Sequence, residues 1–142
     1  MQVETILQSK GHAVFTVEAG APISEAIAIL NGKKIGAVVV VDAKGKVAGI
    51  LSERDIVRRL DKDPVALLAS PVRSAMTAKV ITCTSGASVS DLMETMTRHR
   101  IRHIPIVEAG KLTGIVSIGD VVKRKIEEAE QEANALKEYI AS

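Results

Sequence analysis

Apolar residues follow two spacings along the chain, and these spacings predict amphipathic helices and short strands. Residues 23–30 and 89–96 repeat their apolar side chains every three or four positions, which is typical of one buried helical face. Runs rich in β-branched residues indicate strands at residues 37–41, 47–51, 104–107 and 112–116, with shorter extended pieces at 14–17 and 80–83. Two further helices are predicted to start at Ser52 and Ser117, directly after a strand.

The predicted elements occur twice in the same order, which indicates a tandem repeat. Thr16 aligns with Thr82 and Ser24 with Ser90 at an offset of 66 residues, and a single gap near Lys44 changes the offset to 65. Beyond the gap, GILS at residues 49–52 aligns with GIVS at residues 114–117. Each unit has the order β-α-β-β-α, so the predicted fold class is mixed α/β (α+β).

The repeat also predicts how the chain divides into domains. Residues 1–62 form the first unit with an N-terminal lead-in, and residues 72–125 form the second unit. Residues 63–71 form a linker in which Pro64 and Pro71 interrupt regular structure. The two lead-in segments, residues 3–7 and 72–76, resemble each other as well.

A long amphipathic helix is predicted over residues 119–140, continuing from the second unit. Its apolar residues are separated by steps of 4, 3, 4, 3 and 4, the spacing of a coiled-coil seam: Val122, Ile126, Ala129, Ala133, Leu136 and Ile140. Two interpretations are open. The helix packs back on its own domain, or it meets its copy in a dimer.

The helix starts at Ser52 and Ser117 carry the first candidate chemistry. Each has a Ser at the helix start and an Asp three residues later, Asp55 or Asp120. One interpretation is a capping box, in which Ser and Asp satisfy the free N–H groups of the first turn. The other is a ligand site, because a helix N-terminus favours phosphate and a carboxylate can accept hydrogen bonds from ribose hydroxyls.

The second candidate is the basic segment at residues 98–103, where a helix ends and a strand begins. Cations complement the dipole of a helix C-terminus, which is the simpler explanation. Arg100, Arg102 and His103 also suit an anionic ligand, since Arg forms bidentate contacts with phosphate. The first repeat has Gly36 and Ala37 in place of Arg102 and His103, so two sites are expected to differ in affinity.

Composition narrows the function classes. The chain has 142 residues, of which 46% are hydrophobic and 25% charged, so it can bury a core. A net charge of +2 and one Phe, one Tyr and no Trp argue against a nucleic-acid partner. The single cysteine, Cys83, excludes an internal disulfide and a Cys-rich zinc site.

Metal chemistry, catalysis and membrane insertion find no support in the residue pattern. His99 and His103 have no evident third metal ligand, and no nucleophile is paired with a base. No apolar run approaches the ~18–20 residues of a membrane span, and the N-terminus has no signal-peptide pattern. We therefore expect a soluble cytoplasmic protein that is not an enzyme and holds no metal.

The repeated unit resembles the cystathionine-β-synthase (CBS) domain. The resemblance rests on the Gly-x-x-Ser-x-x-Asp endings and on the strand RHIPIV at residues 102–107, and it covers about residues 1–125. Two such units in tandem are similar to a Bateman module, which implies a pseudo-two-fold pair that forms homodimers. The family's modules bind AMP, ADP, ATP, NAD, NADH or S-adenosylmethionine between the units, and no resident cofactor is implied.

The resemblance also implies a set of ligand-binding residues. Asp55 and Asp120 would hold ribose, the serines before them would sit by ribose or phosphate, and the basic residues would meet phosphates. The first strands would lie near adenine, mostly through backbone groups, and the strand after the basic segment would add an apolar wall. The full set is Thr16, Val17, Ser52, Arg54, Asp55, Thr82, Cys83, Arg100, Arg102, His103, Ile104, Pro105, Ser117 and Asp120.

Two functions remain open at this point. The first is a regulatory module that senses an adenine nucleotide and acts, as a homodimer, on an unidentified regulated protein. The second is a structural or protein-interaction module with vestigial pockets. The residues name neither the ligand nor the orientation of the dimer.

Overall fold

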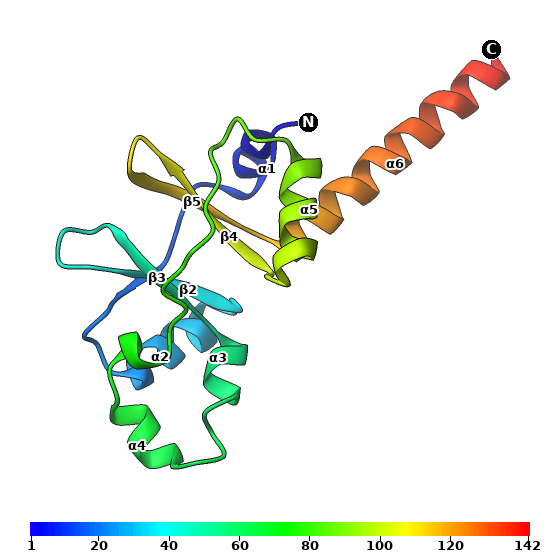
Figure 1. The fold of residues 1–142 in the computed structure, drawn as a ribbon. Helices are drawn as coiled ribbons and strands as arrows, with labels where there is room; N and C mark the ends of the chain where they lie inside the picture. The colour runs from blue at the N-terminus through cyan, green and yellow to red at the C-terminus, as the bar shows by residue number, and fades with distance from the viewer.

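The computed structural model describes all 142 residues and contains the two predicted units (Figure 1). The first half comprises α1 (Val3–Lys10), β1 (Thr16–Glu18), α2 (Ile23–Lys33), β2 (Ala37–Val41), β3 (Val47–Ser52), α3 (Glu53–Val57) and α4 (Pro64–Ala69). The second half comprises the 3₁₀ turn η1 (Val72–Ser74), α5 (Val89–His99), β4 (His103–Glu108), β5 (Lys111–Ser117) and α6 (Ile118–Ala141). The predicted mixed α/β class and the long C-terminal helix are confirmed.

Each unit is built around one antiparallel strand pair that follows its first long helix. β2 pairs with β3 so that Ala37 lies opposite Ser52, and β4 pairs with β5 so that His103 lies opposite Ser117. The two registers are equivalent, which places each serine at the end of a sheet where the next helix begins. β1 adds a parallel edge strand to the first sheet.

The strand predicted at residues 80–83 is not formed, which corrects the element order expected for the second unit. Only Cys83 makes a parallel bridge: its N–H donates to Pro105 O at 3.1 Å, and Val107 N–H donates to its carbonyl at 2.8 Å. Extending this ladder towards the N-terminus would require an N–H at residue 105, and proline has none. The first sheet has Val39 at this position, and β1 pairs there over three residues.

The two lead-in segments are exchanged between the units. Leu7 of α1 is fully buried in the core of the second unit, and Val72 of η1 is fully buried in the core of the first. Glycines permit the close approach: a Cβ added at Gly114 would lie 2.7 Å from Leu7 Cδ2, and one at Gly49 would lie 2.8 Å from Thr77 O. The predicted division into residues 1–62 and 72–125 therefore assigns each lead-in to one unit, whereas its side chains pack in the core of the other.

The segment expected to be a linker, residues 63–71, contains a helix. Asp63 caps α4 by accepting a hydrogen bond from Ala66 N–H at 3.1 Å, and Pro64 occupies the first helical position. Leu67 is buried in the first core, so this segment belongs to the first unit.

The cores lie on one face of each sheet, and the opposite faces meet between the units. Side chains of a strand alternate between its two faces. Val38 and Val40 belong to the first core, whereas Val39 between them is fully buried but belongs to neither core. Pro105 has the corresponding place on β4 and is buried as well. The face between the units is therefore an apolar contact with polar groups at its ends.

α6 begins on the second unit and then leaves it. Val121 is the one buried residue of this 24-residue helix, and Figure 1 shows the later turns projecting away from the rest of the molecule. None of the helices combines the length and the apolar character needed to cross a lipid bilayer.

Candidate functional site

The first candidate group is the helix start at Ser52 and Asp55. Ser52 N–H donates to Asp55 Oδ2 at 2.9 Å, and Asp55 N–H donates to Ser52 Oγ at 3.3 Å, which completes a capping box. The Ser52 hydroxyl also donates to Asp55 Oδ2 at 3.0 Å. The carboxylate is thereby fixed at the end of β3, and its second oxygen has no hydrogen-bond partner in the chain.

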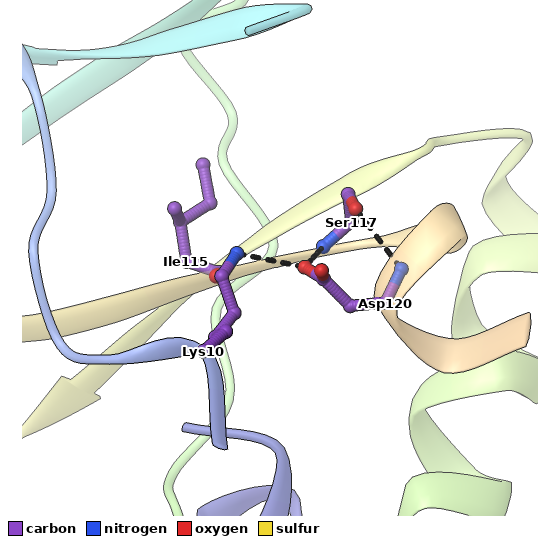
Figure 2. A network of polar contacts seen from close by, with 4 residues as sticks. All are labelled: Lys10, Ile115, Ser117 and Asp120. Carbon is purple, nitrogen blue, oxygen red and sulfur yellow. Dashed lines mark hydrogen bonds and ion pairs between the residues drawn. The ribbon is translucent and has the colours of Figure 1, made fainter. Parts of the chain in front are cut away.

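The second candidate group repeats this capping box at Ser117 and Asp120, with one addition (Figure 2). Ser117 N–H donates to Asp120 Oδ2 at 2.8 Å, and Asp120 N–H donates to Ser117 Oγ at 3.2 Å. The ammonium of Lys10 donates to the same Asp120 Oδ2 at 2.7 Å and to Ile115 O at 2.9 Å. The two repeats therefore differ, because only the second carboxylate is paired with a cation.

The backbone explains how Lys10 reaches this position. Lys10 is the last residue of α1, which is anchored in the second core by Leu7. Gly11 ends the helix with a φ of 99°, a conformation that favours glycine. The exchanged lead-in therefore brings Lys10 of the first repeat to the carboxylate of the second.

The environment of Asp120 keeps its carboxylate charged. Burial raises the pKa of this carboxyl group, but hydrogen bonds from Lys10 and Ser117, together with the charge of Lys10, outweigh burial, so the pKa is lowered overall. A small hollow of about 80 Å³ lies beside the pair, and Lys123 and Arg124 line it together with Lys10. An anion and a hydroxyl-bearing group could both be recognised at this place.

His103 lies at the contact between the units. A Cβ added at Gly36 would lie 3.3 Å from His103 Cε1, so the ring packs directly on the backbone of the first unit. Burial lowers the pKa of His103; the carboxylates of Asp120 and Glu53 partly oppose this effect, and the pKa remains lowered. The glycine at position 36 thus has a packing reason: a side chain there would displace the histidine of the other repeat.

Three predicted arginines come together at an open cleft between the units. The cleft has a cavity volume of about 270 Å³ and is lined by Arg54 of the first unit and by Arg100 and Arg102 of the second. Ile118, in the first turn of α6, forms part of the wall. The cleft therefore borders both capped helix starts and gathers three guanidinium groups, which suits a phosphate-bearing ligand.

The residues expected near adenine divide into exposed and buried positions. Thr16 and Thr82 are exposed, Cys83 is half-buried and Val17 is buried in the first core. Both backbone groups of Cys83 are used by β4, so they are not free for a base, whereas Thr82 has no backbone hydrogen bond in the chain. Burial raises the pKa of the Cys83 thiol, with a smaller contribution from the charge of Asp91, so the thiol stays protonated at neutral pH.

The two residues expected to form an apolar wall of the site are both buried in the structure. Ile104 is fully buried in the second core, where its side chain has no surface to offer a ligand. Pro105 is buried on the opposite face of β4, in the contact between the units. Ile101 and Ile118 are half-buried apolar residues that line the cleft, and Met96 lines it as well but is only 2% exposed.

Lys10 is the main polar residue that sequence reasoning missed. Its counterpart in the second lead-in is Lys79, which is exposed and has no hydrogen bond or ion pair in the chain. The alignment of the lead-ins could have drawn attention to this pair. The contact with Asp120 depends on the exchange of the lead-ins, which the alignment does not contain.

The geometry defines a tandem α/β module with an open cleft between two pseudo-symmetric units. The sequence matches the CBS domain twice, over residues 10–62 and 72–127, so the chain belongs to the CBS-domain family. The resemblance seen in the sequence is thereby confirmed. No group of three or more His, Cys, Asp or Glu side chains is arranged to hold a metal ion.

Solved structures and curated relatives agree with this assignment. The crystal structure of a CBS-domain-containing protein from Agrobacterium tumefaciens is similar with a TM-score of 0.84 and 46% identity, covering 87% of this chain and 92% of that one. A mitochondrial CBS-domain-containing protein of Arabidopsis thaliana is 35% identical over 122 residues, which are 83% of this chain and 59% of that protein. An uncharacterized 17.7 kDa protein of Acidianus ambivalens is 36% identical over 78% of this chain, and the chain spans 66% of its length.

Two further similarities bear on chemistry. The CBS-domain pair of protein MJ0100 was solved in complex with 5′-methylthioadenosine and S-adenosyl-L-methionine; it is similar with a TM-score of 0.80 and 26% identity, covering 90% of this chain and 98% of that one. Inosine-5′-monophosphate dehydrogenase of Aquifex aeolicus is 33% identical over 87% of this chain, but the match spans only 26% of the enzyme. No catalytic family is indicated by these matches.

Proposed function

We propose that this protein is a regulatory module that binds an adenine nucleotide, namely AMP, ADP, ATP, NAD or NADH, in the cleft between its two CBS units. The observation that carries the proposal is the open cleft lined by three arginines, which borders the capped helix starts that carry Asp55 and Asp120. The similar MJ0100 pair, which was solved with two adenosine-containing ligands, supports this ligand class.

Each group would have a separate role in recognition. Asp55 and Asp120 would accept hydrogen bonds from the two ribose hydroxyls, since a carboxylate offers two acceptor oxygens. Arg54, Arg100 and Arg102 would bind phosphate in the cleft. The unused backbone groups of Thr82 and of the edge strand β1 would be available to adenine.

The two sites would differ in their response to ligand. At the second site, ribose would compete with Lys10 for Asp120 Oδ2, whereas the Asp55 carboxylate has no cation to displace. Displacement of Lys10 would loosen the end of α1. Ligand binding would thus be coupled to the position of the lead-in helix, because a ligand shifts a conformation by the contacts it makes in one state and not in the other.

A homodimer that presents this change to a regulated protein completes the proposal. A second candidate function, a protein-interaction module with vestigial pockets, is favoured by the internal pairing of both carboxylates and by exposed apolar residues on α3 and α4, such as Val57 and Val65. The two functions differ in one property, which is whether the ligand-free chain binds a nucleotide at all.

The experiment is a calorimetric titration of the purified, ligand-stripped protein. AMP is titrated first, followed by ATP, NAD, NADH and S-adenosylmethionine. Micromolar binding of one of them supports a sensor and names its ligand. No heat and no thermal shift with any of them would overturn the proposal in favour of the protein-interaction module.

A further inference from the structure

The later turns of α6 carry an apolar stripe that the chain itself does not cover. Ile126 is 53% exposed, Leu136 is 60% exposed and Ile140 is 74% exposed. Every residue from 129 to 142 is exposed, and Figure 1 shows this part of the helix away from both units. An amphipathic helix of this kind gains most of its stability by packing its apolar face on a partner.

The stripe has the heptad spacing of a coiled coil. Ile126, Ala133 and Ile140 take position a, and Val122, Ala129 and Leu136 take position d. Two of the three a positions are Ile and one d position is Leu, a combination that favours two strands. The partner that fits the stripe is therefore a second copy of the same helix.

Charges beside the stripe select the orientation of that copy. Position g is occupied by Lys125, Glu132 and Tyr139, and position e by Lys123, Glu130 and Lys137. In a parallel pair, each g residue lies next to the following e residue of the other helix, which joins Lys125 to Glu130 of the partner subunit and Glu132 to Lys137 of the partner subunit. Two-fold symmetry doubles both attractive pairs.

The antiparallel arrangement brings like charges together. With the apolar layers matched, Glu130 would face Glu130 of the partner subunit, and Lys123 would face Lys137 of the partner subunit. Like charges in contact are destabilising. The charge pattern thus disfavours the antiparallel pair and fits the parallel pair in register.

Contacts within the chain are compatible with the parallel pair. Lys125 donates to Ser90 Oγ at 3.2 Å and lies 3.6 Å from Glu128, and its ammonium has three donor hydrogens to share. The side chains of Glu132 and Lys137 have no hydrogen bond or ion pair within the chain, unlike those of Arg124 and Lys125 on the same helix. The second pair is therefore free to form entirely between copies.

We propose that α6 joins two copies of this protein in a parallel, in-register, two-stranded coiled coil over residues 122–140. The proposal rests on the homodimer of the proposed function and specifies its orientation, but it does not depend on nucleotide binding. Both bodies then lie at the same end of the coiled coil. The two small alanine layers at its centre make the association moderate rather than permanent.

Disulfide cross-linking tests the orientation directly. In a Cys83→Ala background, Ile140→Cys places the only thiol at a position a, where parallel helices bring the two sulfurs together. In an antiparallel pair these residues would be about 27 Å apart. Glu138→Cys, at position f on the outer face of the same turn, is the matched control. Oxidation should give mainly covalent dimer for Ile140→Cys and mainly monomer for Glu138→Cys; equal yields for the two variants would overturn the proposal.

Charge exchange tests the register in the otherwise unchanged protein. Lys137→Glu should weaken the dimer about tenfold in sedimentation equilibrium, because it places two like-charge pairs beside the seam. Adding Glu132→Lys should restore the dimer by recreating both pairs with reversed sign. A Lys137→Glu variant that dimerises more tightly, or a double variant that is not restored, contradicts the parallel pair.

Nucleotide titration of the same variants separates this proposal from the proposed function. These substitutions lie on the projecting part of α6, far along the chain from the arginines of the cleft. Loss of the dimer with unchanged nucleotide affinity supports the coiled coil alone. If the unsubstituted protein binds no nucleotide, the nucleotide proposal is overturned, and the cross-linking result is unaffected.

Discussion

Replacing Lys10 by Met removes one ammonium from the Asp120 carboxylate and keeps the hydrocarbon stem of the side chain. The pair has an N–O distance of 2.7 Å, and the two side chains are 33% and 23% exposed. Asp120 Oδ2 then retains only the hydrogen bond from Ser117 N–H. The substitution also removes the hydrogen bond from the ammonium to Ile115 O, and it frees the carboxylate that the proposed ribose site uses.

The magnitude follows from this partly exposed geometry. Exposed ion pairs contribute up to about 1 kcal/mol, and hydrogen bonds to charged groups contribute somewhat more, so we take about 1 kcal/mol for this pair after allowing for solvent. The ligand-free Lys10→Met protein should be less stable by that amount, which lowers its Tm by several degrees. If ribose displaces Lys10, the same energy no longer opposes binding, and nucleotide affinity at the second site should rise about fivefold.

The assay combines thermal unfolding with calorimetric titration of AMP. Lys79→Met is the matched control, since Lys79 is the exposed counterpart without a partner, and it should change neither quantity. The contact keeps the pKa of Asp120 low, so its stabilisation is present above about pH 4 and is lost as the pH falls through the lowered pKa. The stability difference between Lys10→Met and the native protein should therefore shrink at low pH to the part that belongs to the hydrogen bond with Ile115 O.

Either of two results would refute the reasoning. A Lys10→Met protein that is less stable but binds nucleotide more weakly would show that Lys10 contacts the ligand instead of competing with it. Unchanged stability would show that the ion pair has no energetic role in the ligand-free protein.

Three further predictions concern the contact between the units and the cleft beside it. Gly36→Ala places a methyl group 3.3 Å from His103 Cε1, so we expect a loss of about 1 kcal/mol in urea unfolding, and an unchanged midpoint would contradict the packing role of this glycine. Because burial lowers the pKa of His103, the unfolded chain binds more protons than the folded protein below about pH 6.5. Acidification from about pH 7 to about pH 5.5 should therefore lower the Tm of the native protein more than that of His103→Gln. Parallel Tm curves for the two proteins would refute this prediction. Arg102→Gln should weaken ATP binding about tenfold but leave adenosine binding nearly unchanged, whereas equal losses would place Arg102 away from the phosphates.

The local features of the fold could be predicted from the sequence because they depend on neighbouring residues. Helical spacing located α2 and α5, and the Ser-x-x-Asp pattern located the starts of α3 and α6. The same pattern gave two capping boxes, with the serine and aspartate paired in both directions. At Ser88 and Asp91 the same pattern forms only one half of a capping box, in which Asp91 N–H donates to Ser88 Oγ.

Features that depend on distant segments could not be predicted in this way. The loss of the strand at residues 80–83 follows from the missing N–H of Pro105, which matters only once the two segments pair. The exchange of the lead-ins depends on packing between segments that are far apart in sequence, and the contact between Lys10 and Asp120 joins residues 110 positions apart. Leu67 likewise turns an expected linker into part of the first core.

The positions of charged side chains around the cleft could be predicted from the sequence, whereas the burial of apolar ones could not, and the binding roles of both remain predictions. Arg54, Arg100 and Arg102 share one cleft because guanidinium groups stay at a surface and the repeat symmetry brings the two helix starts together. Ile104 was placed at the ligand from the resemblance, but strand alternation turns it into the second core.

The central claim, that the two capped carboxylates recognise ribose, is tested most directly by one titration. The native protein, the Asp55→Asn plus Asp120→Asn variant and an Asp91→Asn control are each titrated with the tightest adenine nucleotide. Asn keeps a cap acceptor but removes the charge and one of the two acceptor oxygens, while Asp91 stands at an equivalent helix start on the exposed side of α5. We predict a loss of at least about a hundredfold in the double variant and none in the control. Equal affinity of all three proteins would contradict the claim.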